Sequence, residues 1–214
     1  MHPMKHPDVP KALGAALKAA QLIKQRRVEL NRDSLRVELK SSNVDPVTVV
    51  DKESERLIAD LLRAGEAEVA ILGEEGQAGG ACQGGRRWVV DPIDGTVNFL
   101  YDSHAYAVSI ALEVEGRVEL GVVVDVPAGT VFVAALGEGA WRMREGQWER
   151  LKCSQPASLP ESLVATGFSY SAERRKGAGT TGGRPSRAGT RHPAIWLRSF
   201  GFVPRSGGKC GCLL

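Results

Sequence analysis

WVVDPIDGTVNF, residues 88–99, is the most informative stretch of the 214-residue chain. Residues 88–90 predict a short buried strand that ends at Asp91 and Pro92. Pro92 stiffens the turn that follows, and Gly95 lets the backbone come close to a ligand, so Asp91 and Asp94 can point to one place. Taken alone, such a segment is equally typical of a simple turn after a strand, because Asp, Pro and Gly are common turn residues.

Two upstream segments supply further acids where predicted elements begin or end. Asp51 opens a predicted helix, and Glu74 and Glu75 follow a short apolar strand at 69–72. Carboxylates brought together repel one another unless a hard divalent cation neutralises them, and an oxygen-only ligand set favours Mg²⁺. Taken alone, Asp51 is more typical of a helix cap than of a catalytic base. Glu75 is either an outer-shell acid or a solvated surface residue.

The end of the same stretch has the features of a phosphate seat. Gly95, Thr96 and Val97 would present amide N–H groups at a helix start, where anions bind favourably. The chain has no Cys-x5-Arg segment of the kind that forms a covalent phosphoenzyme. We therefore expect direct attack by water on a phosphate ester, assisted by metal ions.

The pattern around these motifs predicts an α+β fold. Residues 10–30 and 51–65 have helical periodicity, the second with a buried face of Leu57, Ile58, Leu61 and Leu62. Strands are expected at 69–72, 88–90, 104–114, 117–126, 130–135 and 139–143, with a further one starting at 162–166. Helices followed by strands in an antiparallel meander predict helices packed on a sheet.

Composition is that of an ordinary globular protein, with 43% apolar and 25% charged residues and a net charge of +3. There is no signal-like apolar run and no zinc-type cysteine pairing, so a reducing cytoplasm is expected. From Gly177 onward there is no Asp or Glu, and Gly, Arg, Pro, Ser and Thr dominate. That composition predicts an irregular tail over 177–214, disordered or non-native.

Several ordered motifs together resemble the inositol monophosphatase family of Mg²⁺-dependent, lithium-sensitive sugar phosphatases. Besides residues 88–99, the resemblance includes Gly73-Glu74-Glu75, the segment 40–51 from Lys40 to Asp51, and the strand-like 105–110 and 121–123. It covers roughly residues 10–170. It implies the layered α-β-α-β sandwich of the sugar phosphatases, mainly its N-terminal half.

The resemblance also implies roles for individual residues. Thr96 and Asp51 would orient and deprotonate a metal-activated water, and Gly95 with Thr96 would hold the substrate phosphate. Lys40 would belong to a flap over the metals. The implied metal ligands are Glu74, Glu75, Asp91, the Ile93 carbonyl, Asp94 and Thr96.

The second half of that fold should follow, and its Trp-Asp motif should complete a second metal site. The chain has no Asp after Asp125, and Trp196 is followed by Leu197. We therefore predict a metal-binding half over 8–150, the start of a second half over 151–176 and a truncated or frame-shifted tail over 177–214. Of the two or three Mg²⁺ ions bound in the family, the second would have an incomplete site here.

The function that the resemblance implies is hydrolysis of myo-inositol monophosphate, a small phosphorylated polyol. Histidinol-phosphate, fructose-bisphosphate and 3′-phosphonucleotide phosphatases share the metal core and are alternatives. A catalytically impaired metal- or phosphate-binding remnant is an alternative of another class. The resemblance to the family implies a homodimer, and neither nucleic acid nor a membrane is an expected partner. A third alternative is that the tail, with its six Lys and Arg residues and no acid, contacts nucleic acid or an anionic surface.

Overall fold

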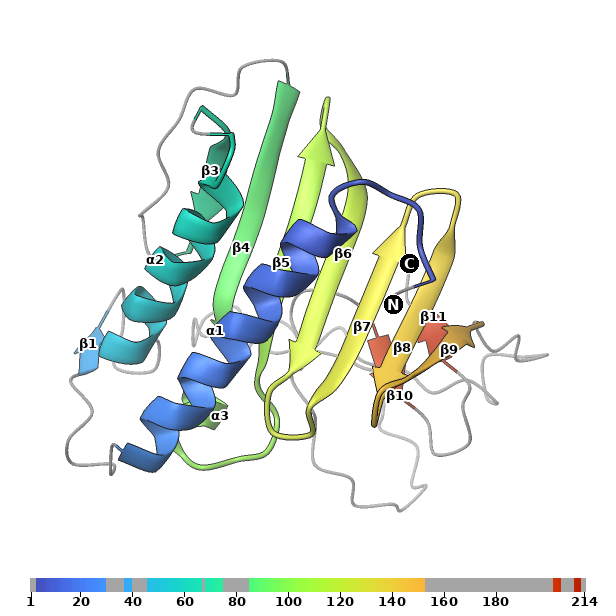
Figure 1. Cartoon of the computed structure of the whole chain (residues 1–214). Coiled ribbons are helices and arrows are strands. Elements are labelled where there is room, and N and C mark those ends of the chain that lie inside the picture. Colours follow the sequence, from blue (N-terminus) through green and yellow to red (C-terminus); the bar gives the residue numbers. More distant parts are fainter. Residues whose placement is uncertain are drawn as a thin grey trace, which may run out of the picture.

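The computed structural model describes residues 3–29, 37–39, 46–66, 68–74, 85–152, 202–204 and 210–212. Two helices lie on one face of a sheet, as the sequence predicted (Figure 1). Lys40, Glu75 and the predicted strand at 162–166 lie outside the described residues.

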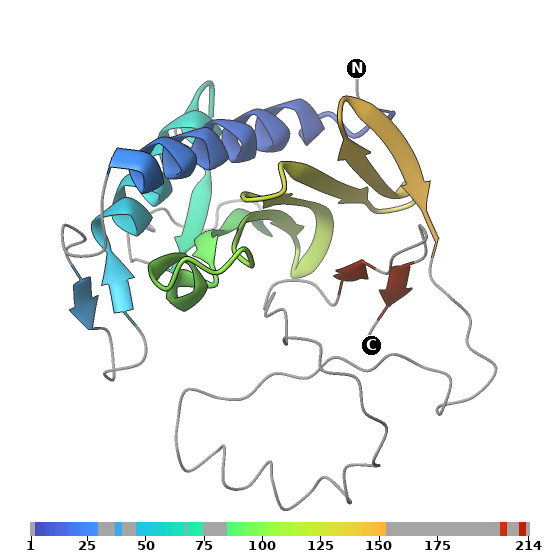
Figure 2. The ribbon, with the colours of Figure 1, turned by 90° about the horizontal axis from the view of Figure 1, so that it is seen from below.

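Helix α1 (Val9–Glu29) packs on the sheet through a face of small residues. Its buried positions are Val9, Ala12, Ala15, Ala16, Ala19, Ala20 and Ile23, which recur at helical spacing. Alanines give α1 a high helix propensity, and their short side chains let its backbone approach β5 and β6. Figure 2 shows α1 running across the sheet.

Helix α2 (Val49–Arg63) begins two residues earlier than predicted. Asp51 therefore lies inside the first turn rather than at the cap position. The predicted apolar face is confirmed for Ile58 and Leu62, which are fully buried, whereas Leu57 and Leu61 are only partly buried. The buried face of α2 is thus shifted toward Asp51, Ser54, Glu55 and Ala59.

Seven strands form the main sheet, in the chain order β3-β4-β5-β6-β7-β8-β9. Their bounds are β3 (Ala70–Gly73), β4 (Arg86–Asp94), β5 (Ala107–Val114), β6 (Arg117–Asp125), β7 (Thr130–Ala135), β8 (Gly139–Arg144) and β9 (Gln147–Leu151). The meander from β4 to β9 is antiparallel as predicted, but β3 pairs with β4 in parallel. Strand β9 was not predicted, because its alternation is short and mostly polar.

Short two-stranded pairs lie outside the main sheet. Strands β1 (Val37–Leu39) and β2 (Pro46–Thr48) pair with each other, as do β10 (Phe202–Pro204) and β11 (Cys210–Cys212). The pair β10–β11 falls in the stretch predicted to be irregular. The remainder of 177–214 is outside the described residues.

Strand β4 does not end at Asp91-Pro92 as predicted but continues to Asp94 through an irregularity. Asp91 pairs with Ser109 and Asp94 with Ala107, so β4 contains one residue more than β5 between these pairs. Partners opposite each other share a face, and Ala107 and Ser109 are two residues apart. The bulge therefore turns Asp91 and Asp94 to the same face, although a regular strand would place them on opposite faces.

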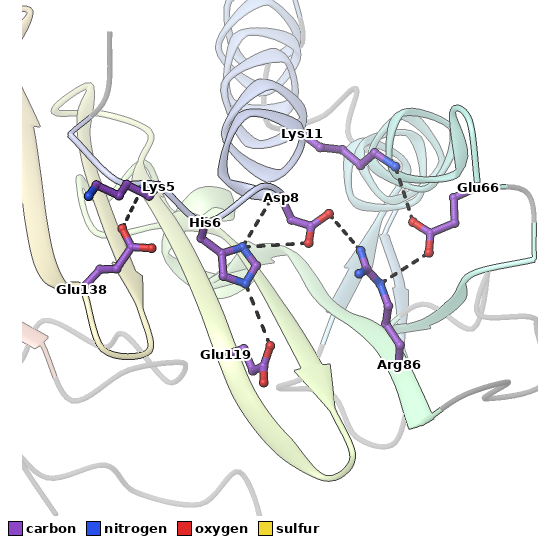
Figure 3. A network of polar contacts seen from close by, with 8 residues as sticks. All are labelled: Lys5, His6, Asp8, Lys11, Glu66, Arg86, Glu119 and Glu138. Carbon is purple, nitrogen blue, oxygen red and sulfur yellow. Dashed lines mark hydrogen bonds and ion pairs between the residues drawn. The ribbon is translucent and has the colours of Figure 1, made fainter.

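A polar network ties the helix layer to the sheet at the end where β4 begins (Figure 3). Arg86, the first residue of β4, lies 2.9 Å from Asp8 at the start of α1 and 3.4 Å from Glu66 after α2. Lys11 reaches Glu66 at 3.5 Å. Because Arg86 and Asp8 are partly buried, their contact is less screened by water than that of a fully exposed surface pair.

Replacing Arg86 by alanine should lower the free energy of unfolding by about 1–2 kcal/mol, because Asp8 loses a charged partner in a partly buried place. Urea denaturation measures the loss. The matched control is Arg144→Ala, since Arg144 and Glu145 form a pair with 70% and 87% exposed side chains. Equal losses in the two variants would contradict a special role for the network.

Candidate active site

Asp51 is a buried acid in the first turn of α2, with an exposed fraction of 2%. A carboxylate in a first helical turn is favoured by the helix dipole, which offsets part of the cost of burying its charge. Asp51 thus comes from the helix layer, at the end of the sheet where β4 finishes (Figure 1).

Thr96 begins helix α3 (Thr96–Leu100) and joins Asp51 to β4. Its Oγ1 lies 3.1 Å from Asp51 Oδ2 and 3.0 Å from the carbonyl oxygen of Ile93. A hydroxyl has one hydrogen to donate and two lone pairs to accept with, so Thr96 donates to one acceptor at a time. The structure therefore brings together the predicted pair Asp51–Thr96, with the predicted Ile93 carbonyl beside it.

Gly95 allows α3 to start directly after β4. Its φ is +92°, a left-handed value, and a Cβ there would lie 2.9 Å from the carbonyl oxygen of Ala105. The same carbonyl accepts a hydrogen bond of 2.7 Å from Asn98 Nδ2. Asn98 therefore fastens α3 to the chain entering β5, a role that sequence reasoning did not identify.

The remaining predicted acids lie at the ends of neighbouring strands. Asp94 has an exposed fraction of 4% and Asp91 is partly buried. Glu74 is exposed and follows β3, whose last residue Gly73 pairs with Val90. Because β3 and β4 are parallel, Glu74 leaves the sheet beside Asp91.

These donors fit a hard cation in their chemistry, since every predicted ligand is an oxygen. However, the part of the chain that the structure describes contains no group of three or more His, Cys, Asp or Glu side chains arranged to hold one ion. Glu75, the other predicted acid of this segment, lies outside that part. Bringing Asp91 and Asp94 to one face is what a shared metal site requires, and the described residues supply an incomplete set.

A second set of contacts holds α3 from the helix layer. Arg27 lies 2.7 Å from Asp102 and stacks over the Phe99 ring at 5.4 Å from its centroid, and Phe99 meets Tyr106 edge to face. Burial raises the pKa of Tyr106. Phe99 and Tyr106 both belong to the buried core. Nothing in the sequence signalled that Arg27, in the last turn of α1, would contact Phe99.

Two further acids, Asp102 and Asp125, make contacts within the chain. Asp102 pairs with Arg27, and Asp125 Oδ1 accepts a hydrogen bond from the amide of Ala128 at 3.0 Å. Burial raises the pKa of the Asp125 carboxyl. His104 is exposed, as predicted.

A sequence model described as "Inositol monophosphatase family" matches residues 5–194. The chain belongs to the inositol monophosphatase family. The match to the family extends past Lys176, where the composition changes.

Relatives within the family carry different names. The inositol-1-monophosphatase of Mycobacterium leprae is 44% identical over 172 residues, which are 75% of this chain and 58% of that protein. The Nus factor SuhB of Escherichia coli is 37% identical over 170 residues, 79% of this chain and 61% of that one.

Solved structures of family members also resemble the chain. Mycobacterium tuberculosis SuhB is 41% identical with a TM-score of 0.64, covering 78% of this chain and 60% of that one. SuhB from Bartonella henselae is 30% identical with a TM-score of 0.69, covering 77% and 61%. The chain thus spans about three fifths of the length of the relatives it matches.

Gly95→Ala should destabilise the protein more than Gly116→Ala does. Both glycines have a left-handed φ, +92° and +77°, which costs a residue with a Cβ about 1–2 kcal/mol. Only at Gly95 does the new Cβ also meet backbone, since Gly116 has open space around it. Chemical denaturation of both variants isolates the steric part, and equal losses would contradict the close approach of residues 95 and 105.

Proposed function

We propose that the chain is a Mg²⁺-dependent phosphomonoesterase that hydrolyses myo-inositol monophosphate to inositol and phosphate. The observation that carries the proposal is the hydrogen-bonded pair Asp51–Thr96 beside the Ile93 carbonyl, in a member of the inositol monophosphatase family. The name of the M. leprae relative, inositol-1-monophosphatase, supports the choice of substrate.

Thr96 and Asp51 would remove the proton from the attacking water. The lone pairs of Thr96 Oγ1 can accept a hydrogen bond from that water, while its own hydrogen points to Asp51 Oδ2, 3.1 Å away. Asp51 would take the proton through Thr96 as water attacks phosphorus and the ester oxygen leaves. Its burial keeps other water from competing for this contact.

Glu74, Asp91, the Ile93 carbonyl, Asp94 and Thr96 would hold Mg²⁺, with Glu75 as a further ligand. Bound there, Mg²⁺ would supply positive charge that makes water more acidic and neutralises the leaving oxygen. The donors come from β3, β4 and the start of α3. Their convergence depends on the β4 bulge, which turns Asp91 and Asp94 to one face.

The substrate phosphate would bind at the start of α3. The first amides of a helix have no acceptor within the helix, so Gly95 and Thr96 can donate to phosphate oxygens. Gly95 also leaves no side chain in the way. We propose that Lys40 contributes to a flap over this site.

We further propose that the protein acts in the cytoplasm and forms a homodimer. Neither nucleic acid nor a membrane is a proposed partner.

A catalytically impaired metal- or phosphate-binding remnant is the second candidate. Among the described residues no three acids converge on one point, and a chain that binds Mg²⁺ or phosphate there without turnover is the alternative.

Inositol 1-phosphate is the first substrate to test. The purified chain should release phosphate only with Mg²⁺, and Asp94→Asn should abolish release because one carboxylate ligand is lost. Thr96→Val and Asp51→Asn should each reduce the rate by about 10²–10⁴-fold, the usual contribution of a positioned base. Histidinol phosphate, fructose 1,6-bisphosphate and a 3′-phosphonucleotide, assayed alongside, separate the alternative substrates.

The matched control is Asp60→Asn, which removes an exposed acid from the same helix as Asp51. It should leave the rate unchanged. A folded wild-type chain that binds Mg²⁺ without releasing phosphate would support the remnant instead.

A further inference from the structure

The buried face of α2 changes character along its length. Its last turns bury Ile58, Ala59 and Leu62, whereas its first turns bury Asp51, Ser54 and Glu55. Glu55 is one turn after Asp51 and has an exposed fraction of 1%, so an acid outside the proposed mechanism lies fully inside the protein. A carboxylate is buried only where neighbouring groups compensate for the water that its charge loses.

The Glu55 carboxylate lies against the last residue of β3. A Cβ built on Gly73 would be 2.5 Å from Glu55 Cδ and within 2.7 Å of both carboxylate oxygens. The three atoms nearest to that position all belong to Glu55, and the backbone of Gly73 is not left-handed. A side chain at 73 would therefore have to displace the buried Glu55 carboxylate from the space that it occupies.

This contact sits where the acidic segment leaves the sheet. Gly73 is paired with Val90 of β4 on one side and touches Glu55 on another, so its backbone is held between strand and helix. Glu74 is the next residue. Asp51 and Glu55 are on the same helix. The contact between Glu55 and Gly73 therefore bears on where Glu74 lies relative to Asp51.

We propose that Glu55 is a positioning residue: its carboxylate, packed on Gly73, fixes the start of the Glu74-Glu75 segment against the helix that presents Asp51. Its link to metal binding rests on the proposed function. Glu55 acts through the backbone of residue 73 and is not itself a ligand. Residues that orient ligands in this indirect way commonly contribute tenfold or more to metal affinity.

The test uses the full chain and Mn²⁺ alone as a spectroscopic probe, so that metal binding is read without turnover. Four variants are compared with wild type: Glu55→Ala, Glu55→Gln, Gly73→Ala and the double variant Glu55→Ala/Gly73→Ala. Asp60→Asn is the control for losing one carboxylate from α2. Urea denaturation of each variant gives its stability, and phosphate release at varied Mg²⁺ gives its metal dependence.

Gly73→Ala should be less stable than wild type, because the new methyl group displaces a buried carboxylate. The double variant should regain that stability, because the methyl group then fills the space that the carboxylate has left. Mn²⁺ affinity should fall about tenfold in Glu55→Ala and stay low in the double variant, while Asp60→Asn stays within about twofold of wild type. Glu55→Gln, which keeps the size of the side chain, should weaken Mn²⁺ severalfold and remains informative if Glu55→Ala does not fold.

A double variant that recovers Mn²⁺ affinity together with stability would overturn the proposal, since Glu55 would then only fill space. Wild-type affinity in Glu55→Gln and Glu55→Ala would overturn it too. A wild-type chain that binds Mn²⁺ but releases no phosphate would refute the phosphatase function alone, and the Mn²⁺ affinities would still decide the role of Glu55. A wild-type chain that binds no Mn²⁺ would overturn both.

Discussion

Strand β4 has to satisfy two opposing demands within nine residues. Trp88 and Val90 must be buried in the apolar layer beneath the helices, and the acids that follow must be turned to a common face at its end. Regular alternation meets the first demand but fails the second, because Asp91 and Asp94 are an odd number of residues apart. The bulge resolves the conflict by adding one residue at Pro92-Ile93, and proline is tolerated in a strand at such a position.

The first turns of α2 depend on the same strand end. Asp51 can be buried there because Thr96, placed by the turn after β4, offers it a hydroxyl, and because the helix dipole favours a negative charge. Gly95 makes this placement possible by approaching the carbonyl of Ala105 more closely than any other residue could. The acid, the hydroxyl and the close turn therefore form one arrangement, and a change in any of them displaces the other two.

Much of the fold could be predicted from the sequence, because the spacing of apolar residues indicates which face of a helix or strand is buried. The helices α1 and α2 and the antiparallel hairpins were predicted from periodicity, and the resemblance to the family implied the pair Asp51–Thr96, whose contact the structure shows. What failed depended on three-dimensional context. Pro92 indicated a strand end where the strand bulges and continues, and nothing local distinguishes the parallel pairing of β3. Glu55 reads as a solvated helix residue, since only the neighbouring strand shows why it is buried.

The two parts of the proposed chemistry differ in how much of them the described residues contain. The proposed proton-handling pair lies wholly among the described residues, since Thr96 Oγ1 is within hydrogen-bonding distance of Asp51 and of the Ile93 carbonyl. The metal-holding set draws on strand ends and on residues such as Glu75 that follow them, and no three acids converge among the described positions. A hydrogen bond needs two groups correctly placed, whereas a cation needs several oxygens around one point. The proposed metal site therefore depends on the chain that follows β3, and the orientation of Glu74 relative to Asp91 is the contact on which the proposed chemistry rests most.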